Sequence, residues 1–365
     1  MSNAVSAAAS GTSRGSIEER LRAELGSPTA SITVAQRSPV GAGAFRIGWL
    51  GSPNPANETE RLVAQLRKRA WAEQVALRPP NIYVRVSTGT LRDWVVESFH
   101  APSLVEPGSE RKTLRVSVQR PDRWAESDLN AARAVSVAHS LAALLESRGF
   151  EVETELRTST AESSANAAAR LSIDGLPEHR ELHVGGVEVG YGALRAKYGG
   201  ALCDEDVLQD LTLRGRWQSL ASAHDVQGWS KAALAFVLLR SEVARHVRLN
   251  DASLGADVDD FNLVYAAVVE RPTLRAESAA AEVTEDTVRG LALLLDGLGQ
   301  ASLRGALELE PALVTRQLRA LARQATVATQ TLASDDALWG ALRRGMARAL
   351  ELLGVAPLSA NKNRR

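Results

Sequence analysis

Hydrophobic and polar residues alternate with different periods along the chain, and the first stretch combines helical and strand-like patterns. Ser16 and Glu19 have the spacing of a capping box, so a helix is expected to begin there. Apolar residues then occupy every second position in a later segment, which is typical of a strand with one buried face. The pattern predicts helices over Ser16–Leu25, Glu60–Val75 and Thr90–Phe99, and a strand over Asn81–Ser87. We therefore expect a small α+β domain, which the polar stretch Ala101–Glu110 joins to the next.

The second stretch has the order strand, helix, strand. Apolar residues predict strands over Thr113–Val118 and Phe150–Leu156. Between them, Asp128–Arg148 has helical spacing, and Gly149 is a typical helix stop. Such a βαβ unit has parallel strands and a right-handed crossover. The leucines of one helix face, which should pack on the two strands, are Leu141, Leu144 and Leu145.

From about Gly215 onward the chain is rich in Leu, Ala and Arg and has helical periodicity almost throughout. Breaks between its helices are expected near Asp251–Asp257, Arg271-Pro272, Gly297–Gly299 and Glu310-Pro311. The predicted fold class is therefore α/β plus all-α. It has a small N-terminal α+β domain, a truncated doubly wound α/β domain and a C-terminal helical bundle.

Composition limits the class of protein. Hydrophobic residues make up 45% of the 365 residues, which is enough for buried cores in two or three domains. No apolar run is long enough to span a membrane. The Ala-, Ser- and Gly-rich stretch Met1–Ser16 lacks the apolar core of a signal peptide and is expected to be a disordered tail. The single cysteine, Cys203, excludes an internal disulfide, so a cytoplasmic protein is expected.

Charges balance overall, with 43 basic and 43 acidic residues, but they are distributed unevenly. Seven basic residues accompany one acid, Glu73, within Arg61–Arg92, and ten basic residues accompany five acids within Ala301–Arg365. Acids gather between these ends, as in Asp257–Asp260. Two basic ends would suit an extended polyanion. The alternative is two solvated surfaces without a ligand.

Motifs for catalysis and metal binding are weak. The glycines of Gly185-Gly186 and Gly190-x-Gly192 are not followed by the Gly-Lys-Ser/Thr of a phosphate loop. His179 and His183 are four residues apart, but the glutamate between them is not at the position that a zinc protease requires, and no third ligand is obvious. The Gly-x-Ser-x-Gly elbow of a serine hydrolase is also missing. The residues by themselves predict no metal site and no catalytic site.

Several stretches match, in order, the motifs of one family. Arg133–Val152 contains Leu-Ala-x-Leu-Leu-Glu-x-x-Gly-Phe-Glu-Val, and Asn262–Val268 begins Asn-Leu-Val-Tyr. The first resembles the helix and strand after the HIGH signature of arginyl-tRNA synthetases. The second resembles the segment where their catalytic part passes into the anticodon domain. Pro80–Leu91 looks like the end of their N-terminal additional domain, which touches the outer corner of the tRNA. The segments that resemble their DALR-type helical domain, which contacts the anticodon stem, are Glu310–Ala322 and Ala349–Pro357.

The resemblance implies a division of the chain. The N-terminal additional domain would cover residues 16–105, a degenerate Rossmann-like class I synthetase domain 110–250, and a DALR-like anticodon-binding bundle 251–358. Disordered tails would cover 1–15 and 359–365. The stretch Arg133–Tyr191 leaves room for only one further βαβ unit of about 30 residues, so a full nucleotide-binding sheet is not expected.

The chain departs from the family at the residues that carry catalysis. Where the family has His-x-Gly-His-x-Arg, this chain has Asp128, Asn130 and Ala131 in place of the first histidine, the glycine and the second histidine. A carboxylate repels a phosphate, and alanine offers no donor to developing charge. The closest counterpart of the Lys-Met-Ser-Lys-type loop, near Arg195, lacks the lysines.

Together these features predict a non-catalytic relative that binds tRNA, or a tRNA-processing protein partner, as an adaptor or regulator. No cofactor and no metal are expected. One alternative is a diverged ligase that uses ATP and arginine, with Arg133, Arg195 and Lys197 at phosphates and His139 nearby. Another is a protein–protein scaffold without RNA. The residues expected to contact tRNA are Arg67, Arg69, Arg85, Arg316, Arg319, Arg323, Arg343, Arg344 and Arg348.

Overall fold

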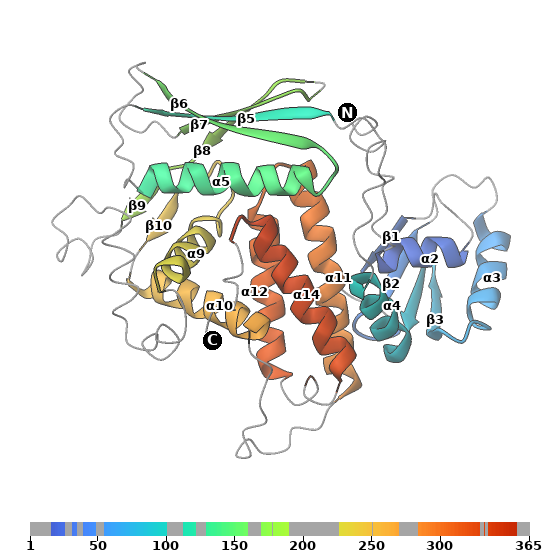
Figure 1. Cartoon of the computed structure of the whole chain (residues 1–365). Helices are drawn as coiled ribbons and strands as arrows, with labels where there is room; N and C mark the ends of the chain where they lie inside the picture. Colours follow the sequence, from blue (N-terminus) through green and yellow to red (C-terminus); the bar gives the residue numbers. More distant parts are fainter. Residues whose placement is uncertain are drawn as a thin grey trace, which may run out of the picture.

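A computed structural model places an N-terminal α+β unit beside a mixed sheet and a set of C-terminal helices (Figure 1). The described residues are 16–25, 31–34, 39–48, 55–100, 112–121, 129–159, 169–176, 178–189, 226–249, 251–269, 284–328, 332 and 335–355. Asp128, Arg195 and Lys197, the linker 101–110, the Arg271-Pro272 break and both expected tails lie outside them.

In the described residues, the N-terminal unit is a four-stranded antiparallel sheet with three helices. Its elements are α2 (Ile17–Leu25), β1 (Ser31–Val34), β2 (Phe45–Gly48), α3 (Pro55–Leu66), β3 (Ala72–Arg78), β4 (Asn81–Val86) and α4 (Thr88–His100). The strand order is β1-β2-β4-β3. The expected capping box is confirmed, because the Ser16 N–H donates to Glu19 Oε2 at 3.1 Å and the Glu19 N–H donates to Ser16 Oγ at 3.2 Å.

The helix expected over Glu60–Val75 is wrong in its second half. Helix α3 ends at Leu66, and the residues that follow, 67–70, are all exposed, so no apolar face continues the helix. Val75 and Leu77 instead pair across the sheet with apolar residues of β4. Sheet pairing therefore decided the conformation of a segment whose helical pattern rested on few residues.

The middle of the chain forms a second, mixed sheet. Its elements are β5 (Thr113–Pro121), α5 (Leu129–Glu146), β6 (Glu151–Ser159), β7 (Ala169–Asp174) and β8 (Arg180–Val184), and the strand order is β6-β5-β7-β8. The expected parallel pairing of β5 with β6 is confirmed. Strands β7 and β8 are antiparallel to their neighbours. A short parallel pair, β9 (Val187–Val189) and β10 (Val247–Leu249), lies apart from this sheet.

This mixed sheet has one apolar and one polar face. Leu114 and Val116 are buried, and α5 packs on all four strands. Arg115, Glu153 and Arg170 are exposed on the opposite face. A doubly wound sheet is parallel and carries helices, and therefore apolar residues, on both faces. The expected doubly wound sheet is therefore not found in the described residues. The strands of the observed sheet alternate apolar and polar residues, so this sheet buries only one apolar face.

Most of the described residues from 226 onward are helical, as expected. The long helices of this C-terminal part are α9 (Val226–Leu238), α10 (Asp251–Val269), α11 (Glu285–Leu307), α12 (Ala312–Val327) and α14 (Asp336–Leu352). The break near Glu310-Pro311 is confirmed. The break expected near Asp251–Asp257 lies just before these residues, because α10 begins at Asp251. The break near Gly297–Gly299 is wrong, because α11 runs through it. A Cβ at Gly297 would lie 2.6 Å from Gln317 Nε2, so this glycine permits close approach of α12 and does not end a helix.

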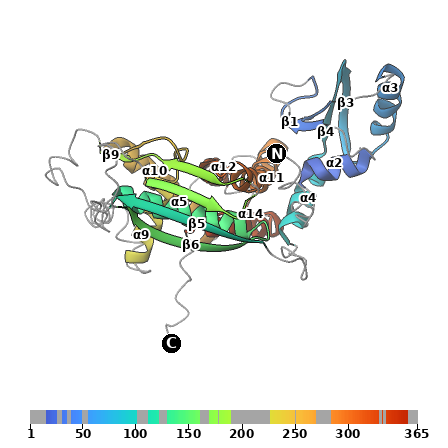
Figure 2. The same cartoon turned by 90° about the horizontal axis from the view of Figure 1, so that it is seen from above.

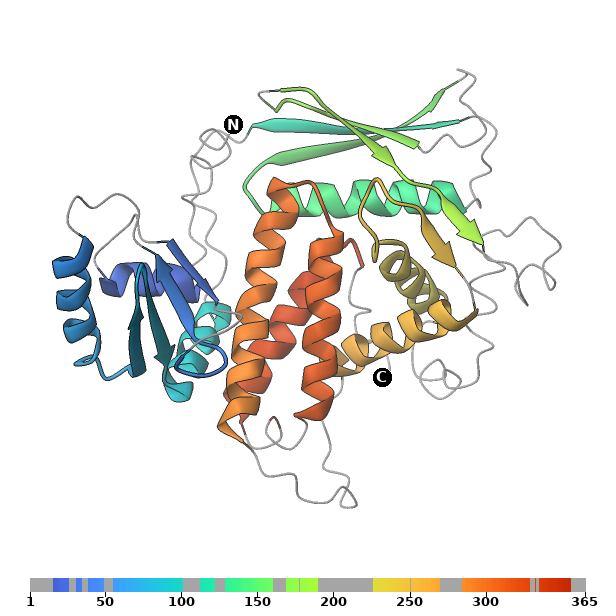
Figure 3. The same ribbon diagram turned by 180° about the vertical axis from the view of Figure 1, so that it is seen from behind.

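Helix α5 lies between the mixed sheet and the C-terminal helices (Figures 1 and 3). Its predicted apolar face is confirmed, because Leu141, Leu144 and Leu145 are buried. On its other side α5 contacts α11 and α14, and Ser140 Oγ donates to the Leu352 carbonyl at 3.1 Å. Helix α5 therefore packs on the mixed sheet with one side and on α11 and α14 with the other.

The N-terminal unit packs through α4 beside α11 and α14 (Figure 2). Arg92 of α4 donates to both carboxylate oxygens of Asp335, at 2.8 and 2.7 Å. Asp335 also caps α14 by accepting from the Leu338 N–H. The first N–H of α2, that of Ile17, donates to Asp296 of α11 at 2.9 Å. Charged and capping contacts therefore join the two parts.

Asp296 is expected to make this docking depend on pH. Burial raises the pKa of Asp296 from 3.8 to about 6, the Ile17 N–H opposes this, Glu18 and Glu19 add to it, and Arg20 lowers it. A carboxyl group with a raised folded-state pKa contributes stability that is fully present below its unfolded pKa and is lost as pH rises through about 6. The difference between the two pKa values corresponds to roughly 3 kcal/mol.

The variant Asp296→Asn keeps an acceptor for the Ile17 N–H and carries no charge. We expect it to be more stable than the wild type at about pH 7, and to remove this group's loss of stability between about pH 4 and pH 7. Urea unfolding across this range measures both effects. Asp259→Asn, at an exposed acid of α10, is the control for loss of one charge. An unchanged pH profile in Asp296→Asn would contradict the prediction.

Candidate nucleic-acid interface

The first turns of α5, which include the position of the second catalytic histidine in the resemblance, are held by hydrogen bonds inside the protein. Asn130 Oδ1 accepts from the Val187 N–H at 2.7 Å. Arg133 is fully buried. Its guanidinium donates to the backbone carbonyls of Gly186 at 3.1 Å, Glu242 at 3.0 Å and Val243 at 3.4 Å. Both polar side chains therefore fasten α5 to β9 and to the loop after α9.

The charge of Arg133 is maintained in this buried place. Burial lowers the pKa of Arg133 to about 10, while Glu310 acts to raise it. Glu310 also accepts from the Val243 N–H at 3.0 Å. His139 is exposed beside Gly354 at the end of the helical part. The structure therefore does not bring Arg133 and His139 together as a phosphate site.

The arginines of α12 share one face, as the spacing predicted, and that face meets acids of α10. Arg319 Nε and Arg323 Nε each donate to Asp260 at 2.7 Å. Arg319 also pairs with Asp257 at 3.0 Å, and Arg240 of the loop after α9 pairs with the same carboxylate. Both aspartates are buried. A phosphate that took Arg319 would remove one of the two arginines that pair with each of these buried carboxylates, which is costly.

The remaining predicted arginines are more accessible. Arg343, Arg344 and Arg348 are exposed on α14, where Arg344 Nε donates to the Phe99 carbonyl at 2.9 Å and Arg348 pairs with Glu351 at 2.9 Å. Exposed pairs of this kind contribute little and exchange readily with other anions. Arg316 lies 3.8 Å from Glu242, and Arg69 lies 3.8 Å from Glu24. Arg67 is exposed just after the end of α3.

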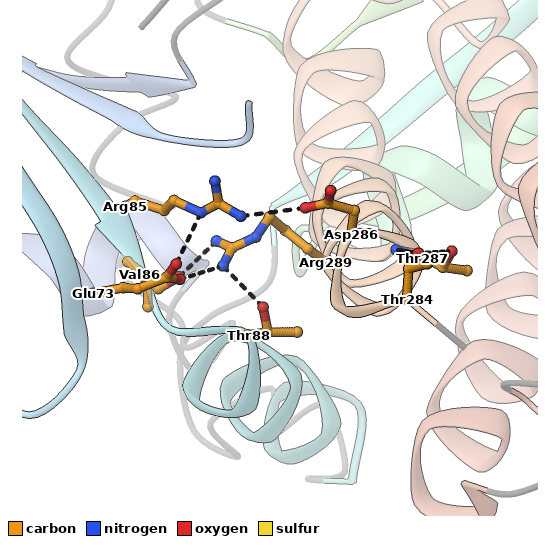
Figure 4. A network of polar contacts seen from close by, with 8 residues as sticks. All are labelled: Glu73, Arg85, Val86, Thr88, Thr284, Asp286, Thr287 and Arg289. Carbon is orange, nitrogen blue, oxygen red and sulfur yellow. Dashed lines mark hydrogen bonds and ion pairs between the residues drawn. The ribbon is translucent and has the colours of Figure 1, made fainter. Parts of the chain in front are cut away.

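Arg85 of β4, one of the arginines expected to contact tRNA, lies between two carboxylates. Its guanidinium lies 3.4 Å from Glu73 and 3.2 Å from Asp286 of α11 (Figure 4). Only 18% of its side chain is exposed. Arg85 therefore bridges the N-terminal sheet and α11 in this structure.

The open face of the N-terminal sheet carries two candidates that the sequence did not indicate. Tyr83 alternates with buried Ile82 and Val84, so it lies on the face opposite the core. Its cross-strand neighbours are Arg46 and Ala76. A tyrosine ring beside a guanidinium and a small residue can stack on a nucleobase while the guanidinium meets a phosphate. The alternation along β4 predicted which face of the strand Tyr83 lies on. Strand β2 has only four residues, too few for a pattern, so the position of Arg46 beside Tyr83 follows from strand pairing alone.

The weak motifs have structural explanations. A Cβ at Gly185 would lie 2.4 Å from the Arg245 carbonyl oxygen, so this glycine allows close packing of two backbone segments. His179 pairs with Asp174 at 2.7 Å and with Glu181 at 3.6 Å. Within the described part of the chain, no group of three His, Cys, Asp or Glu could hold a metal ion. In the same residues, no helix is long and apolar enough to cross a membrane.

This arrangement of sheets and C-terminal helices resembles the fold of arginyl-tRNA synthetases. The Thermus thermophilus arginyl-tRNA synthetase matches with a TM-score of 0.56 and 12% identity, over 93% of this chain and 97% of that chain. The arginyl-tRNA synthetase from Plasmodium falciparum matches with a TM-score of 0.52 and 9% identity, with the same coverage. At such identities the likeness shows the fold alone. No family model matches the sequence, and no curated protein matches it.

Proposed function

We propose that this protein binds tRNA and does not charge it with arginine. Two surfaces would contact the RNA: the open face of the N-terminal sheet, with Arg46 and Tyr83, and the exposed arginines of α14. The fold likeness to arginyl-tRNA synthetases supports RNA as the ligand. Such a protein would act as an adaptor or regulator for another tRNA-dependent protein.

The absence of arginine charging is proposed because the polar side chains in the first turns of α5 bind the protein's own backbone. Transfer from ATP needs donors directed at the phosphates where charge develops. Asn130 and Arg133 instead direct their polar atoms at the backbone of β9 and of the loop after α9. Ala131, at the position of the second histidine in the resemblance, offers no side-chain donor. These residues support positioning of the fold and not phosphate chemistry.

Charge supports the binding part. A polyanion binds where cations can release their present partners at low cost. Arg67 and Arg343 are exposed, and Arg348 pairs with a half-exposed glutamate, Glu351. Arg319 and Arg323, in contrast, hold a buried carboxylate. The interface therefore centres on α14 and the N-terminal unit more than on α12.

The wild type is expected to bind tRNA with an affinity that falls steeply with salt. Replacing Arg67, Arg343 and Arg348 together with glutamine should weaken binding and flatten the salt slope by roughly one unit for each lost phosphate contact. Fluorescence anisotropy with labelled tRNA at several salt concentrations measures both quantities. The matched control replaces three exposed arginines of the mixed sheet's polar face, Arg115, Arg157 and Arg170, with glutamine.

Two outcomes would contradict the proposal. Equal affinity and equal salt slope for the two triple variants would show that the α14 arginines are solvated surface. Arginine-dependent ATP–pyrophosphate exchange by the purified wild type would instead favour the alternative of a diverged ligase. Pull-down of tRNA from cells that express the tagged protein, followed by sequencing, would identify which tRNA is bound.

A further inference from the structure

Arg85 occupies the border between the open sheet face and α11. It follows Tyr83 on the same face of β4, so its guanidinium could complete a basic surface with Arg46. In this structure two carboxylates hold that guanidinium. On its other side a glycine loop closes over it, because a Cβ at Gly41 would lie 2.5 Å from Arg85 Nη1. Arg85 is thus covered by parts of its own chain.

A second arginine anchors the same contact from α11. Arg289 is buried, and its guanidinium donates to the Val86 carbonyl at 2.6 Å and to Thr88 Oγ1 at 2.8 Å. It also pairs with Glu73 at 2.6 Å, so Glu73 bridges Arg289 and Arg85 (Figure 4). These bonds attach α11 to the end of β4 without Asp286.

We propose that Asp286 makes an autoinhibitory contact, in which its carboxylate occupies the place on Arg85 that a phosphate of a bound nucleic acid would take. This inference rests on the proposed function and names how it is regulated. A nucleic acid on the open sheet face binds Arg85 by displacing Asp286. Arg289 keeps the N-terminal unit attached during this exchange, because none of its own partners is displaced.

The two partners of Arg85 differ in how readily they are released. The Asp286 side chain is 78% exposed and lies in the first turn of α11, so water and the helix N-terminus stabilise its charge after release. Glu73 is held by buried Arg289 as well and stays in place. The polar contact at 3.2 Å between Arg85 and Asp286 is therefore the exchangeable one.

The test compares two variants that lose the same charge from the same helical turn. Asp286→Asn removes the charge from the proposed contact, and Glu285→Gln, at the exposed residue before it, is the control. Binding of labelled tRNA and of a labelled uniform oligouridylate is measured for the full chain over a range of salt. We expect Asp286→Asn to bind roughly two- to fivefold more tightly than Glu285→Gln, with a salt slope steeper by about one unit. Adding Arg85→Gln to Asp286→Asn should abolish this gain.

The outcomes separate this inference from the proposed function. Equal binding by Asp286→Asn and Glu285→Gln overturns the autoinhibitory contact, while tRNA binding by the wild type would still support the proposed function. If Asp286→Asn still binds more tightly when Arg85→Gln is added, the inference is also overturned, because the tighter binding would then not depend on Arg85. Binding by Asp286→Asn without binding by the wild type supports a strong autoinhibitory contact. Absence of binding by every variant overturns both.

Discussion

Replacing Arg133 with alanine is expected to lower the free energy of unfolding by roughly 3–5 kcal/mol. The side chain is fully buried and donates to three backbone carbonyls from two separate segments. Alanine would remove all three charge-assisted hydrogen bonds and leave a cavity, although each carbonyl would keep one backbone N–H donor, from Val247, Arg245 or Gly185. Because the same bonds hold β9 and the loop after α9 on α5, that region should also loosen.

Urea unfolding gives the loss of stability, and amide hydrogen exchange locates the loosening in residues 185–189 and 242–247. Arg115→Ala is the control, since Arg115 is half exposed on the polar sheet face and pairs with Glu153 at 3.2 Å. An exposed pair of this kind contributes at most about 1 kcal/mol. Equal and small losses for the two variants would show that the carbonyl contacts of Arg133 contribute little.

Leu144→Ala is expected to cost roughly 2–5 kcal/mol, because it removes buried methyl groups from the layer between the sheet and the helices. Leu144 is fully buried, and a Cβ at Gly305 of α11 would lie 3.5 Å from its Cδ1. The substitution therefore affects the contact of α5 with both layers. Neither layer can collapse into the space without moving the other.

The same unfolding measurement applies to this variant. Leu307→Ala is a matched control on α11, where the leucine is 45% exposed, and it should change stability by less than about 1 kcal/mol. A loss for Leu144→Ala as small as that for Leu307→Ala would mean that α5 does not have the buried face described above. The corresponding loss of hydrogen-exchange protection should extend into β5 and β6.

The sequence by itself determined the elements whose signals are local. The β5-α5-β6 unit was predictable because the spacing of its apolar residues changes from that of a strand to that of a helix and back. Gly149 ends the helical segment with a positive φ of 87°, which glycine adopts without a steric penalty. The parallel pairing followed, because a single crossover helix returns the chain in the same direction. The capping box at Ser16 belongs to the same class of signal.

Short strands were decided by the tertiary structure. Strands β1, β2 and β10 have three or four residues, which are too few to show a period. They form because each pairs with a neighbouring strand. The same pairing turned the segment after α3 into β3, against its helical pattern. Consequently Arg46 came to lie beside Tyr83, which makes the open sheet face a candidate for base stacking.

For the candidate site, the sequence determined which arginines share a face but not what those faces meet. The spacing of Arg319 and Arg323 placed them on one side of a helix, yet their partner Asp260 lies 59 and 63 residues earlier in the chain. Arg85 and Asp286 are 201 residues apart. Helical and strand periods describe neighbours within one element, whereas these ion pairs form only when distant elements pack together. Packing therefore decided which arginines are held inside the protein and which remain accessible to a phosphate.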